Sequence, residues 1–226
     1  MKRLHRIHDI GERAASLLRA QSPGEELANT LSHGVGLAAA VAAAPVLLGA
    51  ALERQGIAVR VGMIIFAVTL VLLYLGSTLY HSWPRTRMKY VLQVVDHSAI
   101  FLLIAGTYTP FTLGPLGGPW GWSLLVVIWS LAIFGVFLKL KTGVQRPRLS
   151  VSLYLAMGWL IVLAARPLAL HVPFRGLLWL GAGGIAYTSG VIFFANERLR
   201  YSHFIWHLFV LAGTGCHFCA VLWYAS

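Results

Sequence analysis

The feature that most constrains this chain is a series of seven long apolar segments, separated by turns that carry charged residues, Gly or Pro. Each segment is close to the length of about 20 residues that a helix needs to cross the hydrocarbon core of a bilayer. Of the 226 residues, 58% are hydrophobic and only 11% are charged, unlike a typical soluble domain. The sequence therefore predicts an all-α integral membrane protein, a bundle of seven transmembrane helices. The fifth span is expected to be cut short by Arg166 and Pro167. The predicted spans are Thr30–Ala51, Ile57–Tyr80, Val94–Leu113, Trp120–Leu138, Leu149–Ala165, Leu177–Ala195 and Phe204–Tyr224.

Residues 27–226 are expected to form this single transmembrane domain, preceded by an N-terminal cytoplasmic segment, residues 1–26. In that segment Leu4, Ile7 and Ile10 recur at near-helical spacing beside basic residues, a pattern typical of an amphipathic helix lying on the membrane surface. A frayed basic tail is the alternative. The segment has no continuous apolar centre, so a cleavable signal peptide is not expected.

The 18 Lys and Arg residues are distributed unevenly between the two sides of the predicted membrane. Arg54, Arg60, Arg166 and Arg175 lie on one side, whereas the other fourteen lie in the N-terminal segment and beside the turns that follow the second, fourth and sixth spans. By the positive-inside rule, the N-terminus is cytoplasmic and the C-terminus is outside. The net charge of +11 is thus interpreted as a topology signal and an attraction to anionic inner-leaflet lipids, and nucleic-acid binding is not expected.

Two histidines, His203 and His207, lie four residues apart at the start of the last apolar segment. On a helix this spacing places both imidazoles on one face, and burying them without a partner would be costly. His81 ends the second span and Asp96 begins the third, so the predicted topology brings all four side chains to the cytoplasmic side. Ser77 precedes His81 by one helical turn and shares its face. Asp96 is the only carboxylate expected in the bundle interior, because the other six acidic residues fall in flanks or loops.

Three neutral imidazoles near a carboxylate fit a catalytic zinc site, in which water occupies the fourth position. Zinc activates such a water, and Asp96 is a candidate acceptor of its proton. If Asp96 were itself a ligand, it would close the coordination sphere and favour a structural or sensing role. Spacing alone leaves another alternative, because a pair of histidines can also serve in packing or interhelical hydrogen bonding.

Four short segments carry a family resemblance. Glu26 to Gly34, Ser77 to His81, Asp96-His97-Ser98 and His203 to His207 resemble, in this order, the signatures of the hemolysin III family. This is a bacterial branch of the progestin and adiponectin receptor superfamily, which is similar to the alkaline ceramidases.

The resemblance covers nearly the whole chain after the N-terminal segment and implies a seven-helix bundle with its N-terminus inside, in a bacterial cytoplasmic membrane. It also implies zinc held by His81, His203 and His207, with Asp96 beside the water on the zinc and Ser77 supporting the site. Receptor members are linked to ceramide hydrolysis, whereas bacterial members carry a cytolysin label and a suggested role in membrane lipid homeostasis.

The remaining histidines are given other roles. His33 begins the first span and is either a fourth ligand or a donor to a ligand, but hydrogen bonding at a helix interface is the favoured interpretation. His97 points about 100° away from Asp96 around a helix, so it is left out of the ligand set. His217 lies ten residues beyond His207, roughly 15 Å along a helix, which is too far for the same ion.

The preferred hypothesis of function is a zinc-dependent hydrolase that cleaves an amide bond in a membrane lipid. The second is a non-enzymatic membrane sensor or receptor, in which a structural zinc joins the second and seventh helices. A pore-forming cytolysin is the weaker third hypothesis, because no predicted helix has a continuous polar stripe and intramembrane charge is nearly confined to Asp96. No oligomeric state is predicted.

The charge distribution predicts the location of the C-terminus. A reporter fused after Ser226 should be active if it works only outside the cytoplasm, and inactive if it works only inside, because the basic residues hold the opposite flanks in the cytoplasm. The measurement compares the two kinds of reporter at this position. Activity of the cytoplasmic reporter alone would reverse the topology and move the histidines to the outer side.

Overall fold

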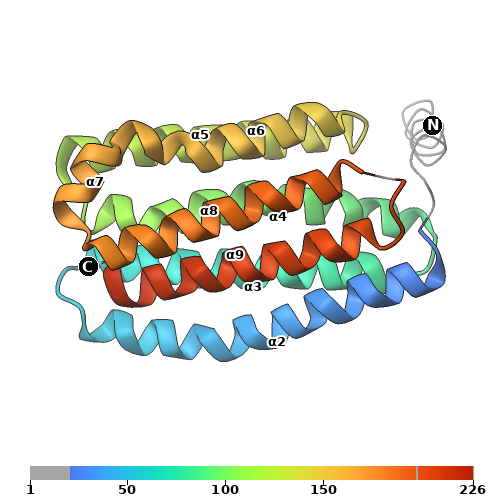
Figure 1. Cartoon of the computed structure of the whole chain (residues 1–226), viewed down its shortest axis with the longest axis horizontal. Coiled ribbons are helices and arrows are strands. Elements are labelled where there is room, and N and C mark those ends of the chain that lie inside the picture. Colours follow the sequence, from blue (N-terminus) through green and yellow to red (C-terminus); the bar gives the residue numbers. More distant parts are fainter. Residues whose placement is uncertain (1–20, 197, 226) are drawn as a thin grey trace.

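The computed structural model describes residues 21–196 and 198–225. Within these residues the structure is all-α, and seven helical spans are long and apolar enough to cross a membrane, which confirms that prediction (Figure 1). Residues 1–20, which contain the proposed surface helix, lie outside the described residues. The spans are α2 (Pro23–Glu53), α3 (Ile57–Ser82), α4 (Arg87–Leu113), α5 (Gly118–Thr142), a composite span (Pro147–His171), α8 (Phe174–Phe194) and α9 (Ser202–Tyr224).

The composite fifth span corrects the sequence prediction. It consists of α6 (Pro147–Trp159), a 3₁₀ turn η1 (Leu160–Ala164) and α7 (Ala165–His171), so it does not end at Ala165. Pro167 is tolerated because it lies in the first turn of α7, where backbone N–H groups have no acceptor within the helix. The Tyr108 hydroxyl of α4 holds the break, since it accepts a hydrogen bond from the Ile161 N–H at 2.8 Å and donates to the Met157 carbonyl at 2.7 Å.

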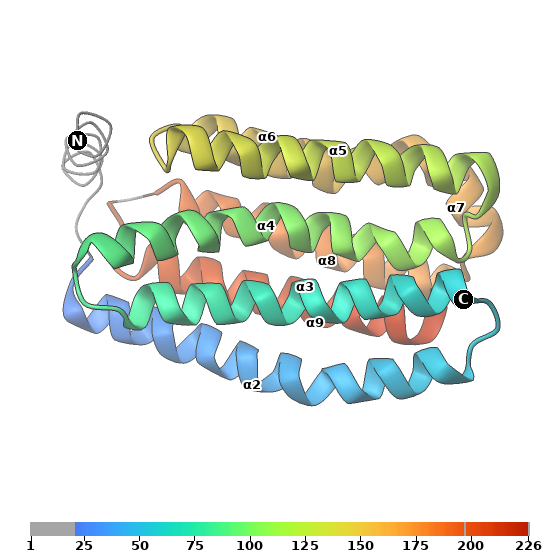
Figure 2. The ribbon, with the colours of Figure 1, turned by 180° about the vertical axis from the view of Figure 1, so that it is seen from behind.

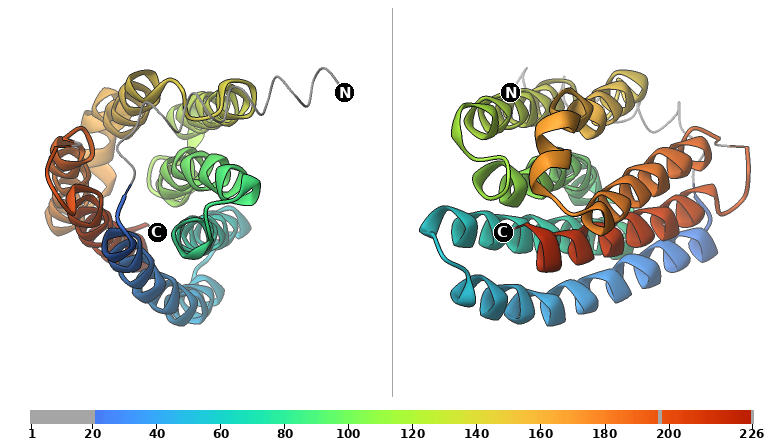
Figure 3. Two further views of the ribbon diagram at one scale, coloured as in Figure 1. Left: turned by 90° about the vertical axis from the view of Figure 1, so that its right-hand side faces the viewer. Right: turned by 60° about the vertical axis from the view of Figure 1, so that its left-hand side comes forward.

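The helices form a ring in chain order, α2, α3, α4, α5, α6, α8 and α9, which closes where α9 packs against α2 (Figure 3). Seen from behind, α5 and α6 lie on one side of α4 and α8, while α3, α9 and α2 lie on the other (Figure 2). Successive spans, with α6, η1 and α7 taken as one, run in opposite directions (Figure 1). The C-terminal end of α3 and the N-terminal ends of α2, α4 and α9 therefore meet at one end of the bundle.

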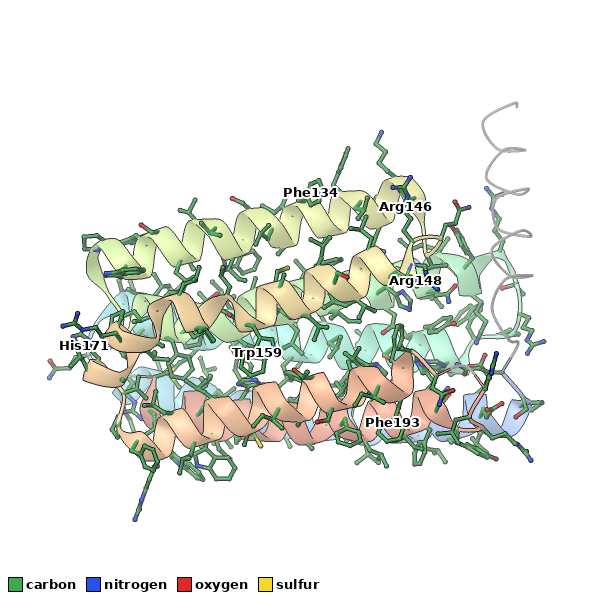
Figure 4. The ribbon with its side chains drawn as sticks, turned by 45° about the horizontal axis from the view of Figure 1, so that its top comes forward. Phe134, Arg146, Arg148, Trp159, His171 and Phe193 are labelled. Carbon is green, nitrogen blue, oxygen red and sulfur yellow. The ribbon has the colours of Figure 1, made fainter. Side chains whose placement is uncertain are left out.

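The outer surface of the bundle is apolar along its length and polar at its ends. Phe134 of α5 points outward and is 53% exposed, which suits contact with lipid rather than water (Figure 4). Arg146 and Arg148 lie at the start of α6, and His171 lies at the opposite end of the same composite span (Figure 4). This surface is what a membrane-spanning bundle requires.

Small residues allow the helices to approach closely. A Cβ atom added to Gly62 of α3 would lie only 2.8 Å from the Cα atom of Pro110 in α4. The neighbouring core residue Phe66 is fully buried. Interfaces between membrane helices favour small residues such as Gly62. Among lipid tails there is no hydrophobic driving force for helix association, so close packing has to stabilise it.

The α3–α4 contact predicts a position that cannot accept a methyl group. Gly62→Ala should lower the free energy of unfolding by about 1–3 kcal/mol, because the added carbon meets backbone that cannot rotate away. Gly49→Ala is the matched control, since a Cβ at Gly49 has nothing within 4 Å. Thermal unfolding in detergent measures both, and equal melting temperatures for the two variants would contradict the packing argument.

Candidate metal centre

Three histidines converge where α3 ends and α9 begins. His81 lies in the last turn of α3, and His203 and His207 lie in the first two turns of α9. One potential ligand atom from each imidazole lies within 4.8 Å of those from the other two. His81 and His207 are 3% and 1% exposed. The three side chains that the sequence grouped are thus brought together, and they can hold a metal ion.

The chemistry of the cluster fits a metal of the zinc type. The rings of His203 and His207 lie 4.6 Å apart between centroids, because their four-residue spacing puts them on one face of α9. The Nε2 atom of His81 is buried and has no hydrogen-bond partner among the described residues. A buried imidazole nitrogen with a free lone pair is costly unless a ligand uses it, and a neutral imidazole nitrogen is a preferred zinc ligand.

Helix α2 supplies polar partners to this cluster. The His81 Nδ1–H donates to the Glu26 carboxylate at 2.8 Å, and the Ser32 hydroxyl oxygen lies 3.0 Å from His207 Nδ1. His33 is stacked on His207 with 3.5 Å between ring centroids, and its Nδ1 lies 2.7 Å from the Ser77 hydroxyl oxygen. The expected interhelical hydrogen bond of His33 is therefore present between α2 and α3.

The contact between Glu26 and His81 corrects the expectation that Asp96 would be the only carboxylate in the interior. Glu25 is also buried, at 3% exposed, where its side chain accepts hydrogen bonds from the backbone N–H groups of Ser22 and Tyr201. The sequence held a signal for this polar face: Glu26, Asn29 and His33 recur at i, i+3 and i+7, one side of a helix. The sequence nevertheless predicts a flank or loop for Glu25 and Glu26, because this acidic pair lies beside Pro23.

Asp96 lies in α4 close to the histidines but is not part of the three-imidazole group. It is 6% exposed, and its carboxylate interacts with the Ser77 hydroxyl. Through Ser77 it is connected to His33. Its role, like that of Ser77, stays a prediction.

A buried lysine stands beside Asp96. Lys139 of α5 is only 1% exposed, with its ammonium nitrogen 3.5 Å from Nδ1 of His97 and within electrostatic range of Asp96. The sequence predicts only that Lys139 is one of the basic residues that flank the fourth span. A charged residue three positions before the end of a helix is expected to be exposed, and only the rotation of α5 about its axis turns Lys139 inward.

A cavity of about 480 Å³ adjoins the site inside the bundle. Its lining is mostly apolar and includes the polar side chains of Asp96, His203 and His207. Gly181 and Gly184 of α8 widen it, since a Cβ at either would meet nothing within 4 Å. A second hollow of about 490 Å³ is lined by Glu26, His81, Arg85 and Lys89 among others, so His81 borders this hollow whereas His203 and His207 border the first.

The histidines excluded from the ligand set lie elsewhere. His217 of α9 borders the same cavity, where its ring stacks on Tyr187 with 5.4 Å between centroids. It is not in the three-imidazole group. His171 is exposed at the end of α7, where its Nδ1–H donates to the Pro167 carbonyl of the same helix at 2.7 Å.

Comparison with known proteins identifies the family. The family model for Haemolysin-III related proteins matches residues 22–218. The chain belongs to the hemolysin III family. Hemolysin-3 of Bacillus cereus is 44% identical over 200 residues, covering 88% of this chain and 91% of that protein. The hemolysin-3 homolog of Bacillus subtilis strain 168 is 43% identical over 200 residues, covering 88% and 94%.

The similarity of this hemolysin III protein extends beyond bacteria. The human monocyte to macrophage differentiation factor is 29% identical over 167 residues, which cover 70% of this chain and 67% of the human protein. The range matched by the family model includes all residues of the candidate metal centre, from Glu26 to His207. The family resemblance seen in the sequence is therefore confirmed.

The cluster predicts one metal ion per chain. The purified protein should contain about one equivalent, and the double variant His203→Ala/His207→Ala should lose it, because one imidazole cannot hold the ion alone. His171→Ala is the control, since that side chain lies at the other end of the bundle. Elemental analysis measures the metal, and an unchanged content in the double variant would refute the assignment.

Proposed function

We propose that this protein is a zinc-dependent integral-membrane hydrolase that cleaves an amide bond in a lipid and contributes to membrane lipid homeostasis. The observation that carries the proposal is the three-imidazole group, two of whose members, His203 and His207, border a largely apolar cavity that is also lined by the buried Asp96. A metal for catalysis, a group to handle protons and a space for an apolar substrate are thus combined in one place.

His81, His203 and His207 would hold the zinc. Three protein ligands leave room for water or substrate, as in catalytic rather than structural zinc sites. When bound, zinc supplies a Lewis acid that polarises a carbonyl group and activates water at neutral pH. The imidazoles would have no other role than to bind and orient this ion.

Asp96 would act as the general base that takes the proton of the attacking water. Its carboxylate borders the same cavity as His203 and His207, and the Ser77 hydroxyl interacts with it. Ser77 would therefore orient the base, and His33 would in turn orient Ser77 through their 2.7 Å contact. The buried Lys139 would offset the negative charge of Asp96.

The cavity supports a lipid as the substrate. Its walls are mostly apolar, with Leu103, Leu177 and Leu180 among the lining residues. An acyl chain would lie along these apolar walls, with the scissile bond beside Asp96, His203 and His207. The resemblance to the alkaline ceramidases supports an amide as this bond.

The proposed location is the bacterial cytoplasmic membrane, with the N-terminus inside. This orientation places the metal centre near the inner headgroups, where the exposed Arg85, which lines the second hollow, would meet anionic lipids. The substrate would then enter from the inner leaflet.

The mechanism predicts that Asp96→Asn separates metal binding from turnover. This variant should keep its zinc but hydrolyse lipid about 100- to 10,000-fold more slowly, because an amide of equal volume cannot accept the proton. His207→Ala should lose both zinc and activity. Ser77→Ala should have a smaller effect than Asp96→Asn, because it removes only an orienting group.

Zinc content and release of fatty acid from ceramide-containing vesicles are measured on the same preparations. Glu53→Gln, the same exchange of acid for amide at the far end of α2, is the control and should behave as the wild type. Wild-type turnover by Asp96→Asn would show that Asp96 is not the base. Zinc binding without hydrolysis by the wild-type protein would favour a sensor with a structural zinc.

A further inference from the structure

Helix α2 contributes no imidazole to the three-histidine group, yet it contacts two of its members. Glu26 lies against His81 and Ser32 lies against His207. Both contacts are made to Nδ1, the ring nitrogen nearer the backbone. In a neutral imidazole one nitrogen carries the proton and only the other can bind a metal, so the partner of Nδ1 decides which atom is available.

The hydrogen bonds around Ser32 determine the proton position on His207. The Ser32 hydroxyl has a single proton, which it donates to the Asn29 carbonyl at 2.9 Å. Its oxygen can then only accept from the ring, so the contact of 3.0 Å is a hydrogen bond from His207 Nδ1–H. This leaves Nε2 of His207 without a proton and ready to bind a metal.

The Glu26 carboxylate has the same effect on His81. Its Oε2 atom accepts from His81 Nδ1 at 2.8 Å, while its Oε1 atom pairs with the Lys89 ammonium at 3.0 Å. Lys89 is itself held in place by the Tyr80 carbonyl at 2.9 Å and the Trp83 carbonyl at 3.2 Å. The carboxylate is therefore fixed and charged, and it keeps the His81 proton on Nδ1.

The atom left free on His81 is the one that a metal would need. Its Nε2 is buried and has no hydrogen-bond partner in the part of the chain that the structure describes. Two different partners, a carboxylate on one histidine and a hydroxyl on the other, thus produce the same arrangement. Both come from a single helix that belongs to neither α3 nor α9.

We propose that Glu26 and Ser32 are positioning residues that hold His81 and His207 in the Nδ1-protonated form with Nε2 directed to the metal, so that α2 sets the metal affinity of the centre. The inference rests on the metal centre of the proposed function but not on hydrolysis. Partners of ligand histidines typically contribute a 10- to 100-fold change in metal affinity, about 1.4 to 2.7 kcal/mol.

The test is zinc affinity, measured on the full-length, metal-free protein in detergent by competition with a chelator. Glu26→Ala should weaken zinc binding about 10- to 100-fold. Glu26→Gln should fall between this variant and the wild type, because its amide oxygen still accepts from Nδ1 but lacks the charge. Ser32→Ala should also weaken binding, and Ser32→Thr, which restores a hydroxyl, should recover it.

Thr30→Val is the matched control. Thr30 lies on α2 between the two positioning residues, and its hydroxyl donates only within the helix, to the Glu26 carbonyl at 2.8 Å. This variant removes a hydroxyl of the same helix without touching a ligand histidine, so its zinc affinity should equal that of the wild type. An equal loss of affinity in Thr30→Val and Ser32→Ala would mean that α2 acts through general stability, and would overturn the inference.

A second measurement reports the proton position directly. In metal-free protein labelled with ¹⁵N-histidine, the nitrogen signals of His207 should correspond to a protonated Nδ1 in the wild type and in Thr30→Val, and should shift towards the other tautomer in Ser32→Ala. A proton on Nε2 of His207 in the wild type, or unchanged zinc affinity in both Glu26→Ala and Ser32→Ala, would refute the proposal. A protein that binds zinc in this way but cleaves no lipid would leave it standing, so the two proposals can fail separately.

Discussion

Lipid hydrocarbon offers no hydrogen bonds, and this property of the surroundings governs the whole structure. Every polar group within a span has to find a partner inside the protein, so the backbone is helical and the buried hydroxyls turn back on their own helices. Thr107 and Thr109, for example, donate to the carbonyls of Leu103 and Ala105. Among the buried polar atoms of the described residues that have no hydrogen-bond partner, Nε2 of His81 is notable because it belongs to the three-imidazole group. An unpaired nitrogen is costly in apolar surroundings unless a ligand binds it. The apolar environment of the bundle therefore favours metal binding at this position.

The same rule explains why α2 matters to a site whose ligands lie on α3 and α9. An imidazole that binds a metal through one nitrogen carries its proton on the other, and in an apolar bundle this N–H needs a hydrogen-bond acceptor on a neighbouring helix. Glu26 is the acceptor for His81, and Ser32 is the acceptor for His207. Because α2 closes the ring between α3 and α9, it touches both ligand helices at once. The helix that completes the fold is therefore also the one that organises the polar end.

The cavity and the composite fifth span belong together. The helix break at η1 is held by Tyr108, and both Tyr108 and residues of the break, such as Ile161, line the cavity. Helix α8, which follows the composite span in the ring, contributes Gly181 and Gly184 to the cavity lining, where larger residues would fill the space. Irregular helix and small side chains thus create an apolar space beside a polar cluster. In the lipid hydrolase that we propose, this space would hold the acyl chain of the substrate, and the bond to be cleaved would lie beside the polar cluster.

The sequence by itself determined the seven spans, because hydropathy and helix length are local properties that the bilayer selects directly. It also determined that His203 and His207 share a face, since their spacing needs only the geometry of one helix, and the order of the spans placed His81 at the same end of the bundle. The tertiary structure decided the rest. It turned Lys139 inward, brought Glu26 to His81 and Ser32 to His207, and continued the fifth span past Pro167. These features depend on how each helix is rotated about its axis and on which helix lies beside it. Both are set by contacts between side chains far apart in the chain, and these contacts form only when the helices pack.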